Sequence, residues 1–222
     1  IEEFSNDESL ARPWFKNSAV ARYATATWTK EKLLYADGVK QLTPGTLLYL
    51  ERFKPILKAR REFQDGNRPW YNLHWARASK IFEHDKIVAP QRSNRNTFGY
   101  NNIPWYASAD VYFITKKGGI DFEPFFLLGI LNSKLIYMWL YYRGKRKGNM
   151  LELYRTPLSE IPIATGTPSQ KQAIEKITRD VITAKTTNPS ADTADLESQI
   201  DQLVYALYNL TPEEIATVEK AS

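Results

Sequence analysis

The stretch KIVAPQRSNRNTFGYNN occupies residues 86–102 and changes character after its first five residues. It begins with a short apolar run, Ile87 to Ala89, and a second run of β-branched and aromatic residues follows at positions 110–115. Runs of this length and composition are typical of strands that are buried on both faces of a sheet. The sequence therefore predicts two core strands, joined by a connection that carries guanidinium and amide side chains.

The composition is that of a folded protein with one large domain or two unequal ones. Hydrophobic residues make up 43% of the 222 residues and aromatic residues 13%, which is enough apolar surface to offset the conformational entropy of the chain. There is no cysteine, which excludes disulfides and thiolate metal sites and agrees with a reducing cytosol. Because the first residue is Ile1 and no leader follows it, we expect a piece of a longer polypeptide.

Charge divides the chain into two unequal parts. Residues 1–165 carry 25 Lys and Arg against 16 Asp and Glu, a net charge of +9, whereas residues 166–222 carry 5 against 9, a net charge of −4. A basic surface commonly binds a polyanion, and a part of the chain with the opposite net charge is expected to have a different role. We therefore expect a basic, polyanion-binding body over residues 1–165 and a helical appendage over residues 166–222.

Helix and strand signals outside the opening stretch alternate along the body. Residues 32–35 have the pattern of a strand, and Thr43 followed by Pro44 predicts the start of a helix that Pro55 should kink. A long apolar helix is expected over residues 124–142.

Towards the C-terminus the signals become helical. The residue before Pro162 is biased away from helix, so residues 158–163 are expected to be extended. Capping boxes open two later helices, Thr167 with Gln170 and Thr211 with Glu214. The chain as a whole predicts an α+β fold, in which a small mixed β-sheet with flanking helices is followed by a C-terminal helical segment.

The sequence lacks the local motifs of catalytic chemistry. No two glycines are spaced G-x-G, which excludes a dinucleotide fingerprint and a phosphate-binding loop. No Asp or Glu stands two residues before a Lys, and the two histidines, His74 and His84, have no acidic cluster nearby. Without Cys or G-x-S-x-G, a nucleophilic triad has no basis. We therefore expect no catalytic residue, metal or cofactor in this chain, and His74 should pack among its aromatic neighbours.

The polar part of the opening stretch has the side chains that contact base edges. Arg pairs with guanine, and Asn or Gln with adenine, each pair being worth roughly 1–3 kcal/mol of discrimination. A polar loop on a rigid scaffold is a common recognition surface, although Asn and Ser equally suit a solvated, turn-rich connection. The candidates for base contact are Gln91, Arg92, Ser93, Asn94, Arg95, Asn96, Asn101 and Asn102.

A second candidate surface follows the long predicted helix, where a glycine-flanked basic loop is expected at residues 143–149. Four cations within five residues suit phosphate contacts that do not depend on base sequence. The alternative is a solvated helix C-terminus, which cations stabilise without any ligand. The candidates for phosphate contact are Arg143, Lys145, Arg146, Lys147 and Asn149.

Four blocks of residues occur in an informative order. They are GNRPWYNLH at residues 66–74, FEHDKIVAPQRS at 82–93, LNSKL at 131–135 and LSEIP at 158–162. In this order they resemble the TaqI-like C-terminal specificity domains. These are the target-recognition domains of adenine-N6 DNA methyltransferases, and of single-chain enzymes that fuse nuclease, methyltransferase and recognition modules. The segment from Leu196 to Ile215 is similar to the end of the fused enzymes, so that the resemblance covers residues 12–218.

The resemblance implies that residues 1–165 are a DNA target-recognition domain within a larger, cytoplasmic prokaryotic enzyme. Its partners would be double-stranded DNA and a catalytic methyltransferase domain of the same parent chain, which would use S-adenosylmethionine. The Asn-Pro-Pro-Tyr/Phe motif of such catalytic domains does not occur here, because no two prolines are adjacent. The family's base-reading residues have no fixed positions, so the candidate residues rest on side-chain chemistry and loop position alone.

Two other interpretations stay open. In one, the C-terminal helices and exposed aromatic residues serve assembly with other proteins, and the basic charge is incidental. In the other, distant carboxylates such as Asp110, Asp121 and Glu123 converge into a nuclease metal site. The apolar segment from Phe125 to Tyr142 is too short and too polar for a membrane span, so we expect a buried helix there.

Overall fold

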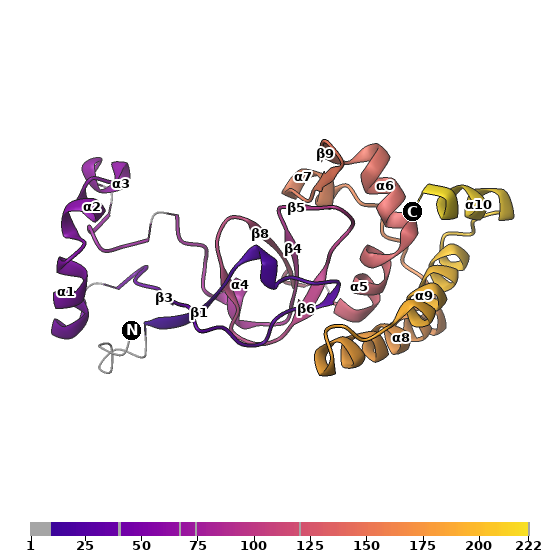
Figure 1. The fold of residues 1–222 in the computed structure, drawn as a ribbon, viewed down its shortest axis with the longest axis horizontal. Helices are drawn as coiled ribbons and strands as arrows, with labels where there is room; N and C mark the ends of the chain where they lie inside the picture. The colour runs from indigo at the N-terminus through magenta and orange to yellow at the C-terminus, as the bar shows by residue number, and fades with distance from the viewer. Residues whose placement is uncertain (1–9, 40, 67, 74, 120, 222) are drawn as a thin grey trace.

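The computed structural model describes residues 10–39, 41–66, 68–73, 75–119 and 121–221. The molecule is elongated, with a helical lobe at one end, small sheets in the middle and a second group of helices at the other end (Figure 1). The helical lobe consists of α1 (Pro44–Glu51), α2 (Lys54–Lys58) and α3 (Arg61–Gln64). Thr43 caps α1, and a new helix begins around Pro55, in agreement with the sequence.

The central sheet has four strands, in the order β2 (Tyr23–Ala24), β6 (Gly99–Asn101), β4 (Lys86–Pro90) and β8 (Val111–Thr115). β4 is antiparallel to both of its neighbours, with Ile87 opposite Tyr100 and Ile114. Every residue of β4 is buried, whereas β8 is an edge strand in which only Val111 is fully buried. The prediction of two strands buried on both faces is therefore right for β4 and wrong for β8.

β6 lies inside the stretch that the sequence assigns to a polar connection. It pairs with β2 on one side and with β4 on the other. Gly99 permits this arrangement, because a Cβ atom there would lie 2.6 Å from the Ala24 carbonyl oxygen and would push the two strands apart. The prediction of one continuous loop is therefore wrong at Gly99–Asn101, and it is also wrong at Arg92–Ser93, which form a short strand of another sheet.

A second sheet joins β3 (Lys32–Leu34), β1 (Ala11–Phe15) and β7 (Tyr106–Ala107) in that order. Phe15 stacks on the fully buried Trp105 with 4.7 Å between the ring centroids. These rings belong to a second, smaller core, which this sheet shares with Val88 of β4 and Val111 of β8. The short helix η2 (Asn17–Ala19) follows β1, and the short helix α4 (Lys80–Glu83) precedes β4. The strand predicted at residues 32–35 is confirmed.

The third sheet has the order β5 (Arg92–Ser93), β10 (Met150–Glu152) and β9 (Lys145–Lys147), and α7 (Arg155–Ser159) follows β10. The predicted basic loop is thus a β-hairpin, in which Gly148 takes a φ of 59° that glycine tolerates better than other residues. α7 also includes the first two residues of the segment predicted to be extended, and Glu160 keeps a helical backbone conformation, so that prediction is wrong at residues 158–160.

The predicted long helix over residues 124–142 is two helices, α5 (Pro124–Asn132) and α6 (Lys134–Arg143), which meet at 65°. Ser133 leaves the helical conformation, with ψ at 159°, and its hydroxyl accepts a hydrogen bond from the Ile136 amide (3.3 Å). A serine N-cap of this kind starts a new helix without any change in hydropathy, so the apolar pattern could not show it. No single described helix is long and apolar enough to cross a membrane; only the bent pair together passes that test.

The C-terminal helices are α8 (Pro168–Thr187), α9 (Ala194–Leu207) and α10 (Pro212–Ala221). The predicted capping box of Thr167 and Gln170 is confirmed. Ile174 and Val204 share one hydrophobic core with Ile87 of β4, so these helices pack on the body. The α+β prediction is confirmed, because helices and small sheets together build this core.

A buried carboxylate links α9 to the start of α6. Asp201 is 5% exposed, and its Oδ1 accepts a hydrogen bond from the Lys134 amide (2.8 Å). Burial raises the pKa of Asp201 to about 6, although the hydrogen bond from Lys134 and the charges of Lys134 and Arg22 act in the opposite direction. The native state therefore binds a proton more tightly than the unfolded chain, whose Asp pKa is about 3.9.

Asp201→Asn is expected to stabilise the protein above pH 6. Asn keeps the oxygen that accepts from Lys134 but needs no proton, whereas native Asp201 loses stability as the pH rises from about 4 to about 6. The gain in free energy of unfolding should be about 1–2 kcal/mol at pH 7.5 and close to zero at pH 4. Urea unfolding of both proteins at the two pH values measures it. An equal difference at both would contradict the titration of Asp201.

Candidate nucleic-acid interface

The third sheet brings the two candidate surfaces of the sequence together. In its register, Arg92 of β5 and Lys145 of β9 both lie opposite Glu152 of the central strand β10. In the next row, Ser93 and Arg146 lie opposite Leu151. Side chains that are far apart in the sequence thus belong to one small surface.

This sheet has one face towards the protein and one towards solvent. Leu151 is 1% exposed and marks the inner face, where the guanidinium of Arg146 lies over the ring of Tyr141 at 4.0 Å. Because neighbouring residues of a strand point to opposite faces and paired residues to the same face, the other five side chains share the solvent side. We call this the outer face; it consists of Arg92, Lys145, Lys147, Met150 and Glu152.

Two hydrogen bonds fix the guanidinium of Arg92 on the outer face. Its Nε donates to Glu152 Oε1 (3.1 Å) and its Nη2 donates to the hydroxyl of Tyr154 (3.1 Å). Desolvation acts to raise the pKa of Glu152, but the hydrogen bonds from Arg92 and Tyr154 and the charges of Arg92 and Lys145 leave it below its usual value. The outer face thus carries three cations and one ionised carboxylate, and one of the cations, Arg92, is held in a defined orientation.

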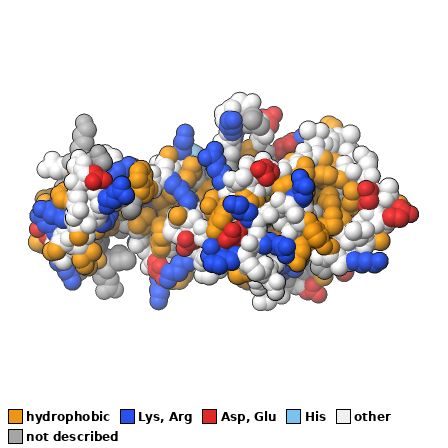
Figure 2. Space-filling model, turned by 90° about the horizontal axis from the view of Figure 1, so that it is seen from above, with side chains coloured by type: hydrophobic (Ala, Val, Ile, Leu, Met, Phe, Trp, Pro, Cys, Tyr) orange, Lys and Arg blue, Asp and Glu red, His pale blue; other side chains and the backbone are white. Residues whose placement is uncertain are grey.

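The outer face belongs to a wider basic surface. Figure 2, which views the molecule from the side of β9 and α7, shows Lys and Arg side chains gathered over the middle of this face and again towards the α1–α3 end. Lys145 and Lys147 are exposed and make no ion pair with a described residue. A surface of this kind can hold phosphates through charge while a fixed guanidinium contacts a base edge.

Several other candidates lie beside the sheet. Gln91 uses its backbone to join strands, since its amide donates to Asp110 O (2.7 Å) and its carbonyl accepts from the Leu153 amide (2.9 Å). Asn94 and Arg95 are exposed on the connection after β5. Partial desolvation lowers the pKa of the Arg95 guanidinium, and the charge of Arg22 lowers it further.

Two predicted base readers are inside the protein, which corrects the sequence-based expectation. Asn96 is fully buried, and its Nδ2 donates to the carbonyls of Leu131 (2.7 Å) and Ser133 (2.8 Å), where it supports the break between α5 and α6. Asn101 is 5% exposed because β6 places it in the central sheet. Neither side chain can reach a base edge, so both are removed from the candidate interface.

Three further candidates are exposed but differ in position. Asn102 lines a cavity beside α4, away from the outer face. Arg143 ends α6 and lines a separate hollow with Trp139 and Glu160. Asn149 lies in the turn of the β9–β10 hairpin, at the rim of the outer face.

No local sequence pattern indicates the cluster that holds the connection after β5. Arg22 donates to the Asn96 carbonyl through Nη1 (2.9 Å), and through Nη2 to the Asn132 carbonyl (2.9 Å) and to Glu197 Oε2 (2.6 Å). The Asn132 side chain in turn pairs with the backbone of Phe98. We call Arg22, Asn96, Asn132 and Glu197 the anchor. It ties the connection to the α5–α6 break and to α9, and could be recognised only once these segments are placed together.

Carboxylates do not gather into a metal site in the described part of the chain. No group of three His, Asp or Glu side chains there could hold an ion, so Asp110, Asp121 and Glu123 do not converge. Glu123 forms an ion pair with Lys171 instead (2.7 Å). His74 lies outside the described residues, so its predicted packing among aromatic side chains stays a prediction.

Comparison with known proteins agrees with this architecture. The family model of the TaqI-like C-terminal specificity domain matches residues 14–163, which include the central sheet, the outer face and the anchor residues up to Asn132. The chain belongs to this family. The TaqI-like match ends before α8, so Glu197 of the anchor comes from the helices that follow the matched region.

Curated relatives of this TaqI-like domain are methyltransferases by name. The type II methyltransferase M.MjaIV of Methanocaldococcus jannaschii is 24% identical over 220 residues, which cover 94% of this chain and 72% of that protein. The type II methyltransferase M.HincII of Haemophilus influenzae is 28% identical over 146 residues, 61% of this chain and 29% of that protein. A putative type II restriction enzyme and methyltransferase of M. jannaschii, RM.MjaORFECS2P, is 33% identical over 96% of this chain but only 21% of its own length.

The fold of this TaqI-like domain also occurs in a solved structure. The type IIL restriction-modification enzyme MmeI, in complex with DNA, matches with a TM-score of 0.68 at 15% identity. The match covers 96% of this chain and 30% of MmeI. The chain therefore spans less than a third of M.HincII, RM.MjaORFECS2P and MmeI.

Proposed function

We propose that the chain recognises double-stranded DNA as the specificity domain of a larger adenine-specific DNA methyltransferase or fused restriction-modification enzyme. The observation that carries the proposal is the outer face, where the oriented Arg92 shares one face of the sheet with Lys145 and Lys147. The family and the names of the relatives support it. Residues 1–165 would recognise DNA in the cytoplasm of a prokaryote, and residues 166–222 would hold the connection after β5 through Glu197.

Each group of side chains has a separate task in this mechanism. Lys145 and Lys147 bind phosphates, which places the sheet on the duplex without regard to base sequence. Arg92, with Asn94 and Arg95 beside it, contacts base edges and supplies the discrimination. The catalytic domain of the parent, which would supply the S-adenosylmethionine chemistry, acts on an adenine that must leave the base stack first.

The test is a selection of DNA by the 222-residue chain. Fluorescence anisotropy with a randomised duplex pool, measured across a salt series, gives affinity and salt slope, and sequencing of the retained DNA gives the target. We expect binding that weakens steeply with salt and an enriched short motif that contains adenine. Retained DNA with no enriched motif would contradict sequence-specific recognition.

A role in assembly is a second candidate, because apolar side chains are exposed on the helical lobe. Leu48 is 74% exposed and Ile56 72%, which is unusual for residues of this size on adjacent helices. Sedimentation of the chain without DNA tests this role. Self-association that is insensitive to salt, together with no DNA binding at low salt, would favour assembly over recognition.

A further inference from the structure

A groove of about 660 Å³ lies between α7 and the edge strand β8. Its lining combines three cations with apolar and aromatic side chains. The cations are Arg77, Lys117 and Arg155, and the apolar and aromatic side chains include Tyr112, Ile114 and Leu158.

The charge of this groove distinguishes it from other cavities. None of the described residues that line it is Asp or Glu. The cavity beside α4 combines Lys80 and Lys116 with the carboxylates of Glu83 and Asp85. A groove with cations and no carboxylate attracts an anion, whereas mixed charges neutralise one another.

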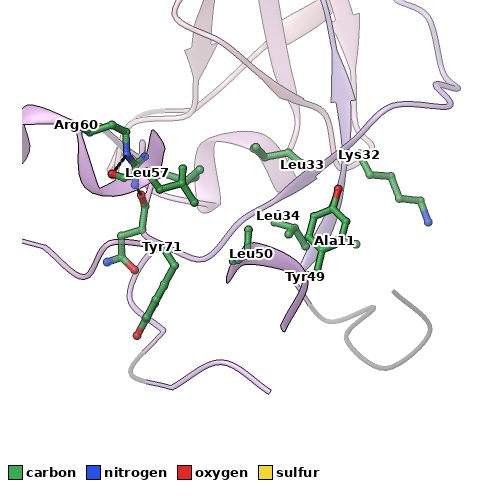
Figure 3. Close-up of a pocket in the computed structure, with 11 residues that line it drawn as sticks. Ala11, Lys32, Leu33, Leu34, Tyr49, Leu50, Leu57, Arg60 and Tyr71 are labelled. Atoms are coloured by element: carbon green, nitrogen blue, oxygen red, sulfur yellow. Dashed lines mark hydrogen bonds between the residues drawn. The ribbon is translucent and has the colours of Figure 1, made fainter. Parts of the chain in front are cut away.

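A pocket between the helical lobe and strands β1 and β3 gives a contrast, because a cation that lines it already has hydrogen-bond partners within the protein. Arg60 lines that pocket, and its Nε donates to Leu57 O (3.0 Å) (Figure 3). Its Nη2 donates to Asn72 O (2.8 Å) and to Trp70 O (2.6 Å). Its guanidinium serves the fold. In the groove, by contrast, Lys117 and Arg155 are exposed and make no ion pair with a described residue.

The third cation of the groove is oriented by the protein. Arg77 donates through Nη1 to Val111 O (2.9 Å), and its guanidinium lies over the ring of Phe113 at 5.4 Å. These contacts use one of its five N–H donors and leave others for a ligand. The groove thus has one oriented guanidinium and two exposed cations.

The groove continues the outer face. Tyr154 accepts a hydrogen bond from Arg92 of the outer face. The centroid of its ring lies 5.9 Å from that of Tyr112, which lines the groove. Arg155, the next residue, lines the groove. Figure 1 places α7 beside β9, with β8 on the side towards α1–α3. The groove, which α7 and β8 line, therefore begins next to the outer face.

We propose that this groove holds the phosphodiester backbone of the DNA that flanks the recognised site on one side. The inference rests on the proposed function and extends it, because it lengthens the DNA contact beyond the bases that are read. The edge of β8 could also pair with a peptide strand, but three cations without a carboxylate fit a polyanion better than a peptide backbone.

The test compares duplexes of different length. The selected site is placed in a short duplex, and in duplexes extended on one side or on the other. For the wild-type chain, extension on one side should steepen the dependence of log K on log salt concentration by about 1.8 for two added phosphate contacts. The double variant Lys117→Ala, Arg155→Ala should lose that increment, and should bind the short duplex as the wild type does.

The matched control is the double variant Lys80→Ala, Lys116→Ala, which removes the same charge from the cavity beside α4. It should keep the increment. An unchanged slope for Lys117→Ala, Arg155→Ala on every duplex would overturn the inference and leave the peptide as the better occupant, and an equal loss on short and extended duplexes would overturn the assignment to flanking DNA. Absence of binding by the wild-type chain to any duplex would overturn the proposed function, and the inference with it.

Discussion

Arg22→Ala is expected to lower the free energy of unfolding by about 2–4 kcal/mol, because it removes the centre of the anchor. Its guanidinium donates to two backbone carbonyls and to Glu197, and the two side chains are only 15% and 23% exposed. Without Arg22 the largely buried carboxylate of Glu197 loses its ion-pair partner. Burial acts to raise the pKa of Glu197, and the charge and hydrogen bond of Arg22 keep it below its usual value.

Urea unfolding measures this loss, and a surface ion pair provides the control. Lys16 pairs with Glu31 at 2.7 Å, but their side chains are 64% and 39% exposed, so Lys16→Ala should cost less than about 1 kcal/mol. Glu197→Gln in the Arg22→Ala background should recover part of the stability, because it removes the uncompensated charge. If Arg22→Ala costs no more than Lys16→Ala, the anchor does not stabilise the fold.

The same variant should also weaken discrimination between DNA sequences. The anchor holds the connection that carries Asn94 and Arg95, and recognition requires these side chains in a fixed position. The ratio of affinities for the selected site and for random DNA is the measurement, taken where the variant is fully folded. Arg22→Lys retains the charge but cannot reproduce the forked hydrogen bonds, so it should restore little of that ratio.

Arg92→Ala is expected to lower affinity for the selected site roughly 10- to 100-fold, with a much smaller loss on random DNA. The guanidinium that Glu152 and Tyr154 orient is suited to a base edge, and its removal costs only sequences that contain the matching base. Arg92→Ala alone also uncovers the carboxylate of Glu152, which would repel every duplex. The comparison is therefore made in a Glu152→Gln background, which leaves the loss of base contact as the remaining difference.

Lys145→Ala with Lys147→Ala is the contrasting variant on the same outer face. It should lower the salt slope by about 1.8 on the selected site and on random DNA alike, because phosphate contacts carry no sequence information. Arg146 lies over Tyr141 on the inner face, so Arg146→Ala should change this slope less. Equal losses on selected and random DNA for the Arg92 variant would assign Arg92 to phosphate contact.

The parts of the fold that depend on local pattern could be predicted from the sequence. Strand β4 follows from its apolar run, and α8 from the Thr167–Gln170 capping box. The break at Ser133 could not be predicted, since one serine inside an apolar stretch also fits a continuous helix. β6 was missed because its strand character comes from pairing on both sides, which Gly99 permits, and not from its own composition.

The candidate site could be predicted only in its chemistry. Residue types identify the cationic and amide side chains, but their positions depend on register: β10 places Arg92 and Lys145 on either side of Glu152, while β6 buries Asn101. Asn96 shows the same limit, since a buried asparagine that supports two helices and an exposed one that reads a base have the same sequence signature. Arg22 lies far from both surfaces in the sequence, and no local pattern indicates its partners.

The two faces of the third sheet differ in how far their residues can be substituted without loss of stability. Leu151 and Leu153 are almost fully buried in the hydrophobic core, whereas positions 145, 147 and 150 lie on the solvent side of the sheet. Substitutions at the solvent-facing positions should therefore cost little stability. Under the proposed function, a lineage carrying this domain would acquire a new target sequence through a handful of surface changes, without passing through poorly folded intermediates.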